Sequence, residues 1–374
     1  MIEKLNSVEL ICKKAKEASY KLAISSNKER NIALKLIANQ ILKSINKITA
    51  ANKKDYIAAK KNKIPSPLLD RLLLNEERIK NMAKDVLNIS KLEDPIGKEL
   101  IKKLRPNGLK ITKVSVPLGV IAVIFESRPN VACDVACLCI KSGNAVILKG
   151  GKEAKHTNEI IIDIIKNTLK KTSLNTNIVS SLKNYSRTSV NQLLKMDKYI
   201  DVLVPRGGKE LIKTVRNKSN IPVFSHLDGI CHTYIDKFAN KKMAINITYN
   251  AKMRRTSICG ATETILCHKD VAKQVLPHLL KKLLNSGCEI RGDSNVALLS
   301  KKIKKASEQD WKKEYLDSIV SIKVVNSLSE AIKHINNYSS KHTDAIITNS
   351  TKNAKLFLTE IESAIVMHNT STQF

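Results

Sequence analysis

The sequence predicts an α/β protein with two successive blocks of buried parallel strands and helices. Three observations predict this class. From residue 117 onward, short apolar runs rich in β-branched residues alternate with helical segments. The chain has 374 residues, a length that corresponds to two or three domains. Hydrophobic residues make up 43% of it, enough to build large cores from Ile, Leu, Val and Ala.

The region before this alternation predicts helices followed by a hairpin. Apolar residues recur at helical spacing between Lys and Glu over 3–90, and an Asp-Pro-Ile-Gly sequence at 94–97 ends the pattern. Residues 99–116 then alternate polar and apolar on both sides of Pro-Asn-Gly, a sequence typical of a tight turn between strands. We therefore expect N-terminal helices and then a β-ribbon at about 99–116.

Two blocks of strands and helices follow the ribbon. The first block has predicted strands at 120–125, 145–150 and 199–204. Helices are expected after them, at about 131–141, 153–171 and 207–217. The second block has predicted strands at 262–268, 318–325, 345–348 and 364–368. The blocks join near 225–235, and we divide the chain into 1–228, 229–366 and a short final segment, 367–374.

The charge balance is strongly basic, because Lys and Arg exceed Asp and Glu by 31. One interpretation is an anionic macromolecular partner such as nucleic acid. The other is a compositional bias, because the lysines are spread along the whole chain and aromatic residues make up only 4% of it. We favour the compositional interpretation and expect no nucleic-acid partner.

The sequence gives no sign of a targeting segment, a membrane span or a metal site. The N-terminus lacks the apolar core of a signal peptide, and the longest apolar run is shorter than the ~20 residues that span a bilayer. The eight cysteines contain no CxxC pair, and His226, Cys231 and His232 do not have a metal-binding spacing. We expect a cytoplasmic protein with reduced thiols, no membrane association and no metal.

Two glycine pairs lie between a predicted strand and a predicted helix. Gly150 and Gly151 follow the second strand, and Gly207 and Gly208 follow the third. Glycines at this place in an open α/β sheet allow close approach of a nucleotide phosphate, which the helix N-terminus also favours. The alternative is that they are ordinary glycines of strand-to-helix turns, because neither pair has the spacing of a known phosphate loop.

Cys259 is the candidate nucleophile. It lies in a polar, basic segment just before a predicted strand, with Arg254 and Arg255 upstream. Neighbouring cations favour the thiolate, and Gly260 allows a substrate oxygen to approach the backbone amide of Cys259. The other cysteines lie mostly in apolar runs that suit burial. The alternative is an unreactive thiol in a loop.

Polar residues also gather where the first strand of the sheet ends. Ser127, Arg128 and Asn130 follow this strand, at the edge where open α/β sheets bind ligands. Asn130 could donate a hydrogen bond to an oxyanion, and Arg128 could hold a carboxylate or phosphate. The alternative is a strand end that is closed by a turn at Pro129.

Together these segments resemble the gamma-glutamyl phosphate reductase (glutamate-5-semialdehyde dehydrogenase) family of the aldehyde dehydrogenase superfamily. The resemblance covers the chain from about residue 100 to its end, and the helical N-terminal region fits it as well. The matching segments are VPLGVIAVIFESRPNV (116–131), IKSGNAVILKGGKEA (140–154), VPRGGKELI (204–212), IPVFSHLDGICHTYID (221–236), NAKMRRTSICGATETIL (250–266), YSSKHTDAIIT (338–348) and SAIVMHNTSTQF (363–374). VIFESRPNV and VPRGG are the most specific to this family.

The resemblance implies the NADPH-dependent reduction of L-glutamyl 5-phosphate to L-glutamate 5-semialdehyde and phosphate, a step of L-proline biosynthesis. It implies that Cys259 attacks the acyl phosphate and forms a thioester, which hydride from NADPH reduces to the aldehyde. Asn130 and the Cys259 amide would hold the oxyanion. Substrate binding would involve Ser127, Arg128, Asn250 and Arg255. Cofactor binding would involve Lys149, Gly150, Glu153, Arg206, Gly207 and Gly208.

The resemblance also implies an architecture and partners. It predicts an aldehyde dehydrogenase-like fold with two Rossmann-like domains and a β-ribbon that serves as an oligomerisation flap. Residues 1–228 would bind NADP, and residues 229–366 would contain the catalytic cysteine. The family assembles into homo-oligomers, and glutamate 5-kinase, which makes the acyl phosphate, is a possible partner. No metal is implied.

The sequence departs from the family pattern in two ways. Gly260 and Thr256 stand where family members usually have Asn and Pro, but neither position carries the covalent step. The chain also ends at Phe374, where the family continues with a GLGAE-type segment and a strand that pairs with a partner's ribbon. An unpaired ribbon edge would weaken the assembly.

Three alternatives remain open from the sequence. The chain could be an inactive truncated homologue. It could be another thioester-forming dehydrogenase that acts on an acyl-CoA or a simple aldehyde, which a phosphate requirement would distinguish. It could also be a basic protein that binds nucleic acid, in which case its affinity for DNA would fall steeply with salt.

Overall fold

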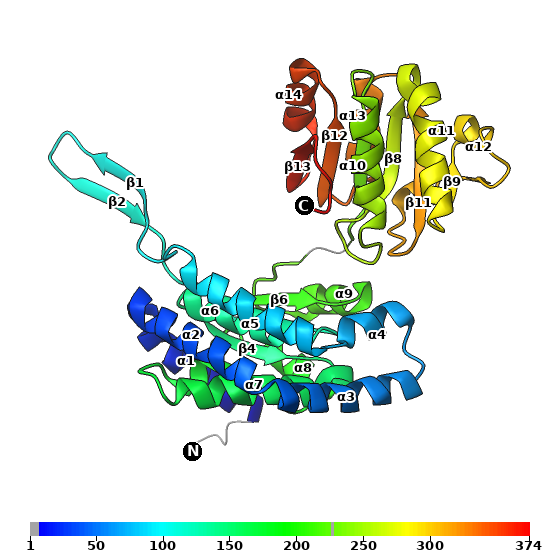
Figure 1. The fold of residues 1–374 in the computed structure, drawn as a ribbon. Helices are drawn as coiled ribbons and strands as arrows, with labels where there is room; N and C mark the ends of the chain where they lie inside the picture. The colour runs from blue at the N-terminus through cyan, green and yellow to red at the C-terminus, as the bar shows by residue number, and fades with distance from the viewer. Residues whose placement is uncertain (1–6, 226–227) are drawn as a thin grey trace. The chain divides into compact units, whose positions relative to one another are not determined.

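The computed structural model describes residues 7–225 and 228–374, and the chain forms two compact units (Figure 1). Unit 1 is Met1–Ser225 and unit 2 is His226–Phe374. The expected division placed the boundary after residue 228 and set 367–374 apart. In the structure this last segment belongs to unit 2, where it contributes to the edge strand and buries Thr372 and Gln373.

Unit 1 begins with a helical layer, as the periodicity of 3–90 predicts. Its helices are α1 (Ser7–Ala23), α2 (Asn27–Lys43), α3 (Ile45–Lys61), α4 (Ser66–Leu72) and α5 (Glu76–Lys91). A capping box defines the start of α2, because the Ser26 side chain accepts from the Glu29 amide and the Glu29 carboxylate accepts from the Ser26 amide. Apolar faces of α1, α2 and α5 then join the core of the unit.

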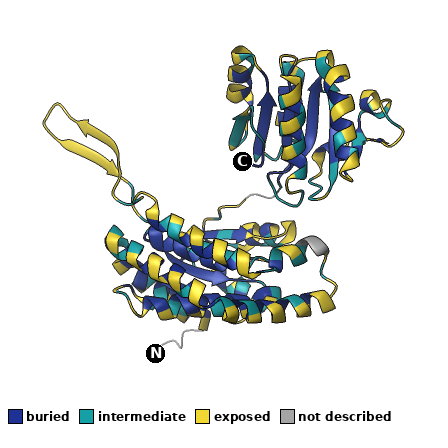
Figure 2. Cartoon of the chain, viewed as in Figure 1, coloured by how far each residue is buried: buried dark blue, intermediate teal, exposed yellow. Residues whose placement is uncertain are grey.

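The predicted β-ribbon is present and projects from unit 1. Strands β1 (Glu99–Leu104) and β2 (Lys110–Val114) pair antiparallel, and Gly108 adopts a left-handed φ of 82° in the turn. Every residue of both strands is exposed (Figure 2). A two-stranded ribbon with no sheet or helix packed on it has little stability of its own.

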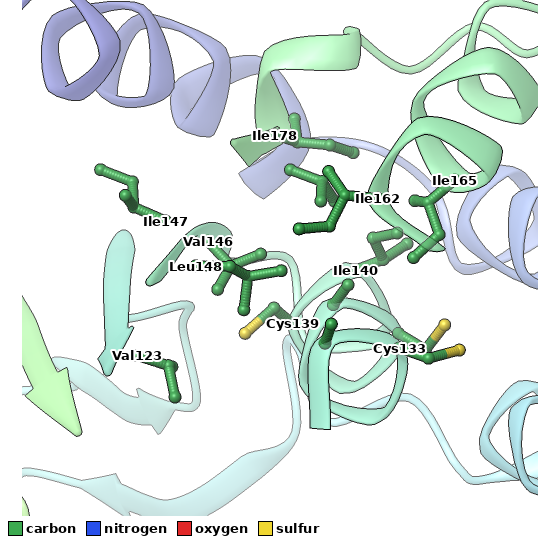
Figure 3. Close-up of a cluster of buried hydrophobic side chains, with 14 of the residues drawn as sticks. Val123, Cys133, Cys139, Ile140, Val146, Ile147, Leu148, Ile162, Ile165 and Ile178 are labelled. Carbon is green, nitrogen blue, oxygen red and sulfur yellow. The ribbon is translucent and has the colours of Figure 1, made fainter. Parts of the chain in front are cut away.

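The sheet of unit 1 has four parallel strands in the order β5-β4-β3-β6. Its strands are β3 (Val120–Phe125), β4 (Ala145–Lys149), β5 (Val179–Ser181) and β6 (Val202–Arg206). The helices α6 (Asn130–Lys141), α7 (Lys155–Leu169) and α8 (Arg187–Leu193) connect them, and α9 (Lys209–Lys218) follows the last strand, β6. Figure 3 shows Cys133 and Cys139 of α6 among aliphatic residues of β4 and α7, so these thiols fill the core as small apolar groups.

The sheet of unit 2 has seven parallel strands in the order β10-β9-β11-β8-β7-β12-β13. These are β7 (Cys231–Ile235), β8 (Thr262–His268), β9 (Glu289–Gly292), β10 (Lys304–Lys305), β11 (Ile319–Val325), β12 (Thr343–Ile347) and β13 (Ile365–His368). The helices are α10 (Lys241–Met253), α11 (Lys269–Asn285), α12 (Ser294–Ala297), α13 (Leu328–Tyr338) and α14 (Thr351–Glu360).

Helices cover both faces of this second sheet, as the contacts of alternate residues along β7 and β8 show. Ile235 and Ile265 pack with α10 and α11, whereas their neighbours Tyr234 and Leu266 pack with α13 and α14. Successive residues of a strand point to opposite faces, so the two clusters are the two faces of the sheet. This double coverage explains why the strands are continuous apolar runs.

The sequence missed several strands for identifiable reasons. The short strands β5 and β9 and the two-residue edge strand β10 have too few residues for a pattern. Strand β7 lies in HLDGICHTYID, a segment that we interpreted as a domain junction, because His232 and Thr233 interrupt its apolar run. Both side chains are nevertheless fully buried. The third predicted strand of the first block, at 199–204, lies at 202–206.

Candidate active site

The carboxyl end of the unit 1 sheet gathers the residues that we expected at the cofactor. The chain runs from β3 outward through β4 and β5, and then returns to the other side of β3 with β6. Ligands bind in open α/β sheets at such a reversal of strand order. The parallel register aligns Ile124 with Lys149 and Phe125 with Arg206, so all three strands end at one edge.

Glu126, which was not among the predicted site residues, holds the turn after β6. Its carboxylate accepts a hydrogen bond of 2.9 Å from the amide of Gly208, the N-cap of α9. A β-carbon at Gly207 would lie 2.4 Å from the same carboxylate oxygen, so a larger residue there would displace the Glu126 side chain. The amide that we expected to face a cofactor phosphate therefore has a carboxylate partner in the chain itself.

Ser127 and Glu153, predicted for substrate and cofactor respectively, contact each other. The Glu153 carboxylate accepts from the Ser127 amide at 2.5 Å and from its hydroxyl at 3.1 Å. Ser127 has a left-handed φ of 47°, a conformation that a non-glycine residue adopts at a cost unless its surroundings hold it. The contact with Glu153 supplies such a restraint.

Lys149 ends β4 as a buried cation at the same edge. Its side chain is 5% exposed, and its ammonium donates to the Gly150 carbonyl at 3.0 Å and lies 5.0 Å from the centre of the Tyr185 ring. Burial lowers the pKa of Lys149, and the Glu153 carboxylate opposes this shift. Lys149, Gly150 and Glu153 therefore form one cluster, beside the Gly207–Gly208 turn.

Asn130, the predicted oxyanion donor, is the first residue of α6. Its side-chain amide donates to the Asp134 carboxylate, one turn later, at 2.9 Å. Burial raises the pKa of Asp134 to about 6, the Asn130 amide opposes the shift, and the Asp85 charge adds to it. Arg128, half-buried, lies in the connection between β3 and α6.

In unit 2, Cys259 lies in the connection between α10 and β8, residues 254–261, which we term the nucleophile loop. Cys259 is half-exposed, whereas the seven other cysteines, all in the described part of the chain, are buried. Burial raises the pKa of thiols such as Cys267 and Cys288, which disfavours their thiolates. Exposure thus distinguishes Cys259 as the thiol that a substrate can reach.

Two residues before and within β7 brace the backbone of Cys259. A β-carbon at Gly229 would lie 2.2 Å from the Cys259 carbonyl oxygen, so glycine permits this close approach. The Cys231 thiol donates to the same carbonyl at 3.1 Å. Burial raises the pKa of Cys231 well above its ordinary value, which keeps the thiol protonated as a donor. Neither residue was predicted for the site.

The segment after β13 packs against residues at both ends of the nucleophile loop. The Thr372 hydroxyl lies 2.9 Å from the hydroxyl of Thr262, and Arg254 donates to the Gln373 carbonyl at 2.6 Å. A β-carbon at Gly260 would lie 2.9 Å from the Thr372 carbonyl oxygen, closer than a β-carbon tolerates against backbone. This contact explains glycine at 260, where the family pattern usually has asparagine.

The two remaining predicted substrate residues lie on the surface near the loop. Asn250 is exposed on the last turn of α10, where its carbonyl accepts from the Arg254 amide. Arg255 is exposed within the loop. Unit 2 therefore brings Asn250, Arg255 and Cys259 into one short stretch of chain, while Asn130 and Arg128 belong to unit 1.

Residues 7–225 and 228–374 contain neither a membrane-spanning helix nor a cluster of metal ligands. No helix there is both long and apolar enough to cross a bilayer. Among the same residues, His, Cys, Asp and Glu side chains nowhere gather in threes in a way that could hold a metal ion.

The fold and the thiol-bearing loop are those of an aldehyde dehydrogenase, and the sequence model of the aldehyde dehydrogenase family matches residues 4–305. Within that class the chain belongs to the gamma-glutamyl phosphate reductase family. It is 43% identical over 369 residues to the gamma-glutamyl phosphate reductase of Ruthia magnifica subsp. Calyptogena magnifica, which covers 99% of this chain and 88% of that protein. It is 46% identical over 363 residues to that of Brucella suis biovar 1, covering 97% and 86%.

A solved structure agrees with this assignment. The gamma-glutamyl phosphate reductase from Thermotoga maritima superposes with a TM-score of 0.94 at 37% identity, covering 99% of this chain and 89% of that one. An acetylating aldehyde dehydrogenase from Geobacillus thermoglucosidasius, at 16% identity and a TM-score of 0.69, shares the fold. The family and the fold class predicted from the motifs are confirmed, and the chain is an enzyme of the oxidoreductase class.

Proposed function

We propose that the chain reduces L-glutamyl 5-phosphate to L-glutamate 5-semialdehyde and phosphate with NADPH, in L-proline biosynthesis. The observation that carries the proposal is the single half-exposed thiol, Cys259, in a braced loop of a chain whose relatives are gamma-glutamyl phosphate reductases. A substrate with an activated acyl group requires a nucleophile that is accessible and fixed in place.

The covalent step follows from the chemistry of a thiolate. The Cys259 sulfur attacks the acyl carbon, a carbon–sulfur bond forms, and phosphate leaves with the electrons of the carbon–oxygen bond. The backbone amide of Cys259 and the side-chain amide of Asn130 are the proposed donors to the oxyanion. Arg255, Asn250, Arg128 and Ser127 are the proposed partners of the substrate's charged and polar groups. When bound, the nicotinamide cofactor supplies the hydride that converts the thioester into the aldehyde.

Enzymes of the aldehyde dehydrogenase family use NAD or NADP, and the residues at the unit 1 edge fit such a dinucleotide. The reversal of strand order, the glycine turns and the buried Lys149 ammonium are what a pyrophosphate and a ribose require. We propose that Lys149, Gly150, Glu153, Arg206, Gly207 and Gly208 hold it, and that residues 1–228 are the cofactor domain.

A preference for NADPH over NADH is supported by the charges at this edge. The Lys149 and Lys155 ammonium groups lie 5.0 and 5.9 Å from the centre of the Tyr185 ring, which concentrates positive charge there. The Glu153 carboxylate is engaged by Ser127, which reduces its repulsion of an additional phosphate.

The exposed ribbon supports a proposed homo-oligomer. Apolar side chains such as Leu100, Ile101 and Ile111 are exposed on β1 and β2, and the outer edges of both strands have unpaired backbone groups. Such an edge is a template for another chain. Glutamate 5-kinase is a proposed partner in supplying the acyl phosphate, and the cytoplasm is the proposed location.

The test runs the reaction in reverse. Purified protein is given L-glutamate 5-semialdehyde, phosphate and NADP⁺, and NADPH formation is followed by absorbance. We expect phosphate-dependent turnover that Cys259→Ala abolishes and that Cys288→Ala, a matched change of a buried thiol, retains. Turnover that needs coenzyme A in place of phosphate, or that survives Cys259→Ala, would contradict the proposal.

A further inference from the structure

The two members of one buried ion pair flank the nucleophile loop in the sequence. Lys252 is in the last turn of α10, just before the loop, and Glu263 is the second residue of β8, just after it. The Lys252 ammonium and the Glu263 carboxylate are 2.6 Å apart, and both side chains are fully buried. The pair therefore joins the two ends of the segment that carries Cys259.

Stability alone does not account for this pair. Removing two charges from water costs free energy that their attraction repays only in part, and apolar residues of similar volume hold a core together as well or better. In some proteins, buried polar and ionic groups fix one arrangement among several. Here the arrangement that is fixed is the separation between the end of α10 and the start of β8.

The second oxygen of Glu263 extends the restraint to another segment. It accepts a hydrogen bond of 3.2 Å from the amide of Leu316, a residue with a left-handed φ of 53°. The carboxylate thus ties three parts of unit 2 together: the end of α10, the start of β8 and the connection that precedes β11. No part of the proposed thioester chemistry uses Lys252 or Glu263.

We propose that the Lys252–Glu263 ion pair is a positioning clamp for the nucleophile loop, which fixes where the Cys259 thiol and the Cys259 amide lie relative to a bound substrate. The inference rests on the proposed role of Cys259 as the nucleophile. An oxyanion donor is effective only where it lies within hydrogen-bond distance of the oxygen that develops charge, so a loop with loose ends loses rate. Lys252 and Glu263 act through Cys259 and do not touch the substrate.

The surroundings of Glu263 give the clamp a pH dependence. The groups that face it are the Lys252 ammonium on α10, the Cys231 thiol on β7, the Glu314 carboxylate and the Leu316 amide before β11, and the Cys288 thiol just before β9. Burial raises the pKa of Glu263 to about 7, against the lowering effect of Lys252. As pH falls through neutrality, the carboxyl takes up a proton and the ion pair becomes a weaker hydrogen bond.

The test compares Lys252→Met, Glu263→Gln and the double variant Lys252→Met/Glu263→Leu. The readouts are kcat and the rate of Cys259 alkylation by iodoacetamide between pH 5.5 and 9, with the modified residue identified by mass spectrometry. We expect Lys252→Met to lower kcat about 100-fold, the scale set by misplacing a reacting group by 1 Å, while KM changes little. Glu263→Gln should remove the inflection near pH 7 from the alkylation profile.

The double variant separates positioning from folding. Two apolar residues should leave the midpoint of thermal unfolding unchanged or higher, because no unpaired charge remains in the core. We expect this stable variant to keep a lowered kcat and an altered alkylation rate. A double variant with wild-type kcat and a wild-type alkylation profile would overturn the proposal and leave the pair with a structural role only.

A surface ion pair supplies the matched control. Lys341 and Glu362 are 2.7 Å apart, as close as the buried pair, but their side chains are 53% and 72% exposed. Lys341→Met should change neither readout. The alkylation measurement needs no turnover, so it tests the clamp independently of activity. An active Cys259→Ala variant would contradict the proposed function and not the clamp.

Discussion

The cofactor edge of unit 1 and the nucleophile loop of unit 2 are held in different ways. At the edge, the carboxylates of Glu126 and Glu153, which follow β3 and β4, accept hydrogen bonds from backbone amides and stay partly in contact with solvent. The nucleophile loop is braced from beneath by buried groups, among them Gly229 and Cys231. In the proposed function a dinucleotide enters and leaves in each turnover, whereas the thiol stays where the acyl carbon meets it. The contacts at the first region suit exchange, and those at the second suit a fixed position.

The largest loss of activity is expected from a change at Gly229, where the backbone of Cys259 approaches most closely. In Gly229→Ala the new β-carbon would overlap the Cys259 carbonyl, so the loop must move. Displacement of a reacting group by about 1 Å costs on the order of 100-fold in rate, so kcat should fall by at least that factor. Steady-state kinetics measure the loss. NADPH affinity, followed by fluorescence titration, should stay at the wild-type value; a loss of both would mean that the two regions are not independent.

At the cofactor edge the expected effect is on affinity. Lys149→Met removes a buried cation and its hydrogen bonds, and hydrogen bonds to charged groups contribute roughly 1.5–3 kcal/mol. KM for NADPH should therefore rise about 10-fold or more, with kcat at saturation changed less than threefold. Lys218→Met, on the exposed last turn of α9, is the control. A fall in kcat with unchanged KM would assign Lys149 to the chemistry instead.

Local sequence patterns predict more of the fold than of the candidate site, for physical reasons. Apolar runs such as 120–125 and 262–268 predicted strands because both faces of each sheet are covered. Cys259 was predicted as the nucleophile because cations and a glycine neighbour it in the chain. The contact between Glu126 and Gly208 depends on the register between two strands, which no local pattern records. Gly229 and Cys231 were missed because polar residues concealed the strand that they precede or begin.

A smaller effect on cofactor affinity is expected from Glu126, whose carboxylate contacts the start of α9. Glu126→Gln removes a negative charge beside the amide of Gly208 while an acceptor oxygen remains. Charges at a helix N-terminus contribute roughly 0.3–1 kcal/mol, so KM for NADPH should fall by a factor of about two to five. The gain should shrink as salt rises, because the repulsion that was removed is screened. A higher KM would mean that Glu126 orders the turn for the cofactor.

The smallest expected effect is on the free energy of unfolding, through the half-buried carboxyl of Asp134. The pKa of Asp134 is raised to about 6 by burial, so the carboxyl binds its proton more tightly in the folded chain than in the unfolded one. Its stabilising contribution is therefore present below pH 4 and is lost as pH rises through 6. Asp134→Asn keeps an acceptor for Asn130 and should stabilise unit 1 at pH 8 by about 1 kcal/mol relative to wild type. Denaturant unfolding at pH 5 and pH 8 measures this; an equal change at both would contradict it.

In the proposed reaction the chain forms its thioester on Cys259, and intact-protein mass spectrometry detects such an adduct. Protein is mixed with L-glutamate 5-semialdehyde and NADP⁺ without phosphate, then quenched in acid, and the adduct is located by peptide mapping. We expect one glutamyl group on Cys259 that disappears when phosphate is added before the quench, and no adduct in Cys259→Ala. An adduct on another residue, or turnover with phosphate in the Cys259→Ala variant, would contradict it.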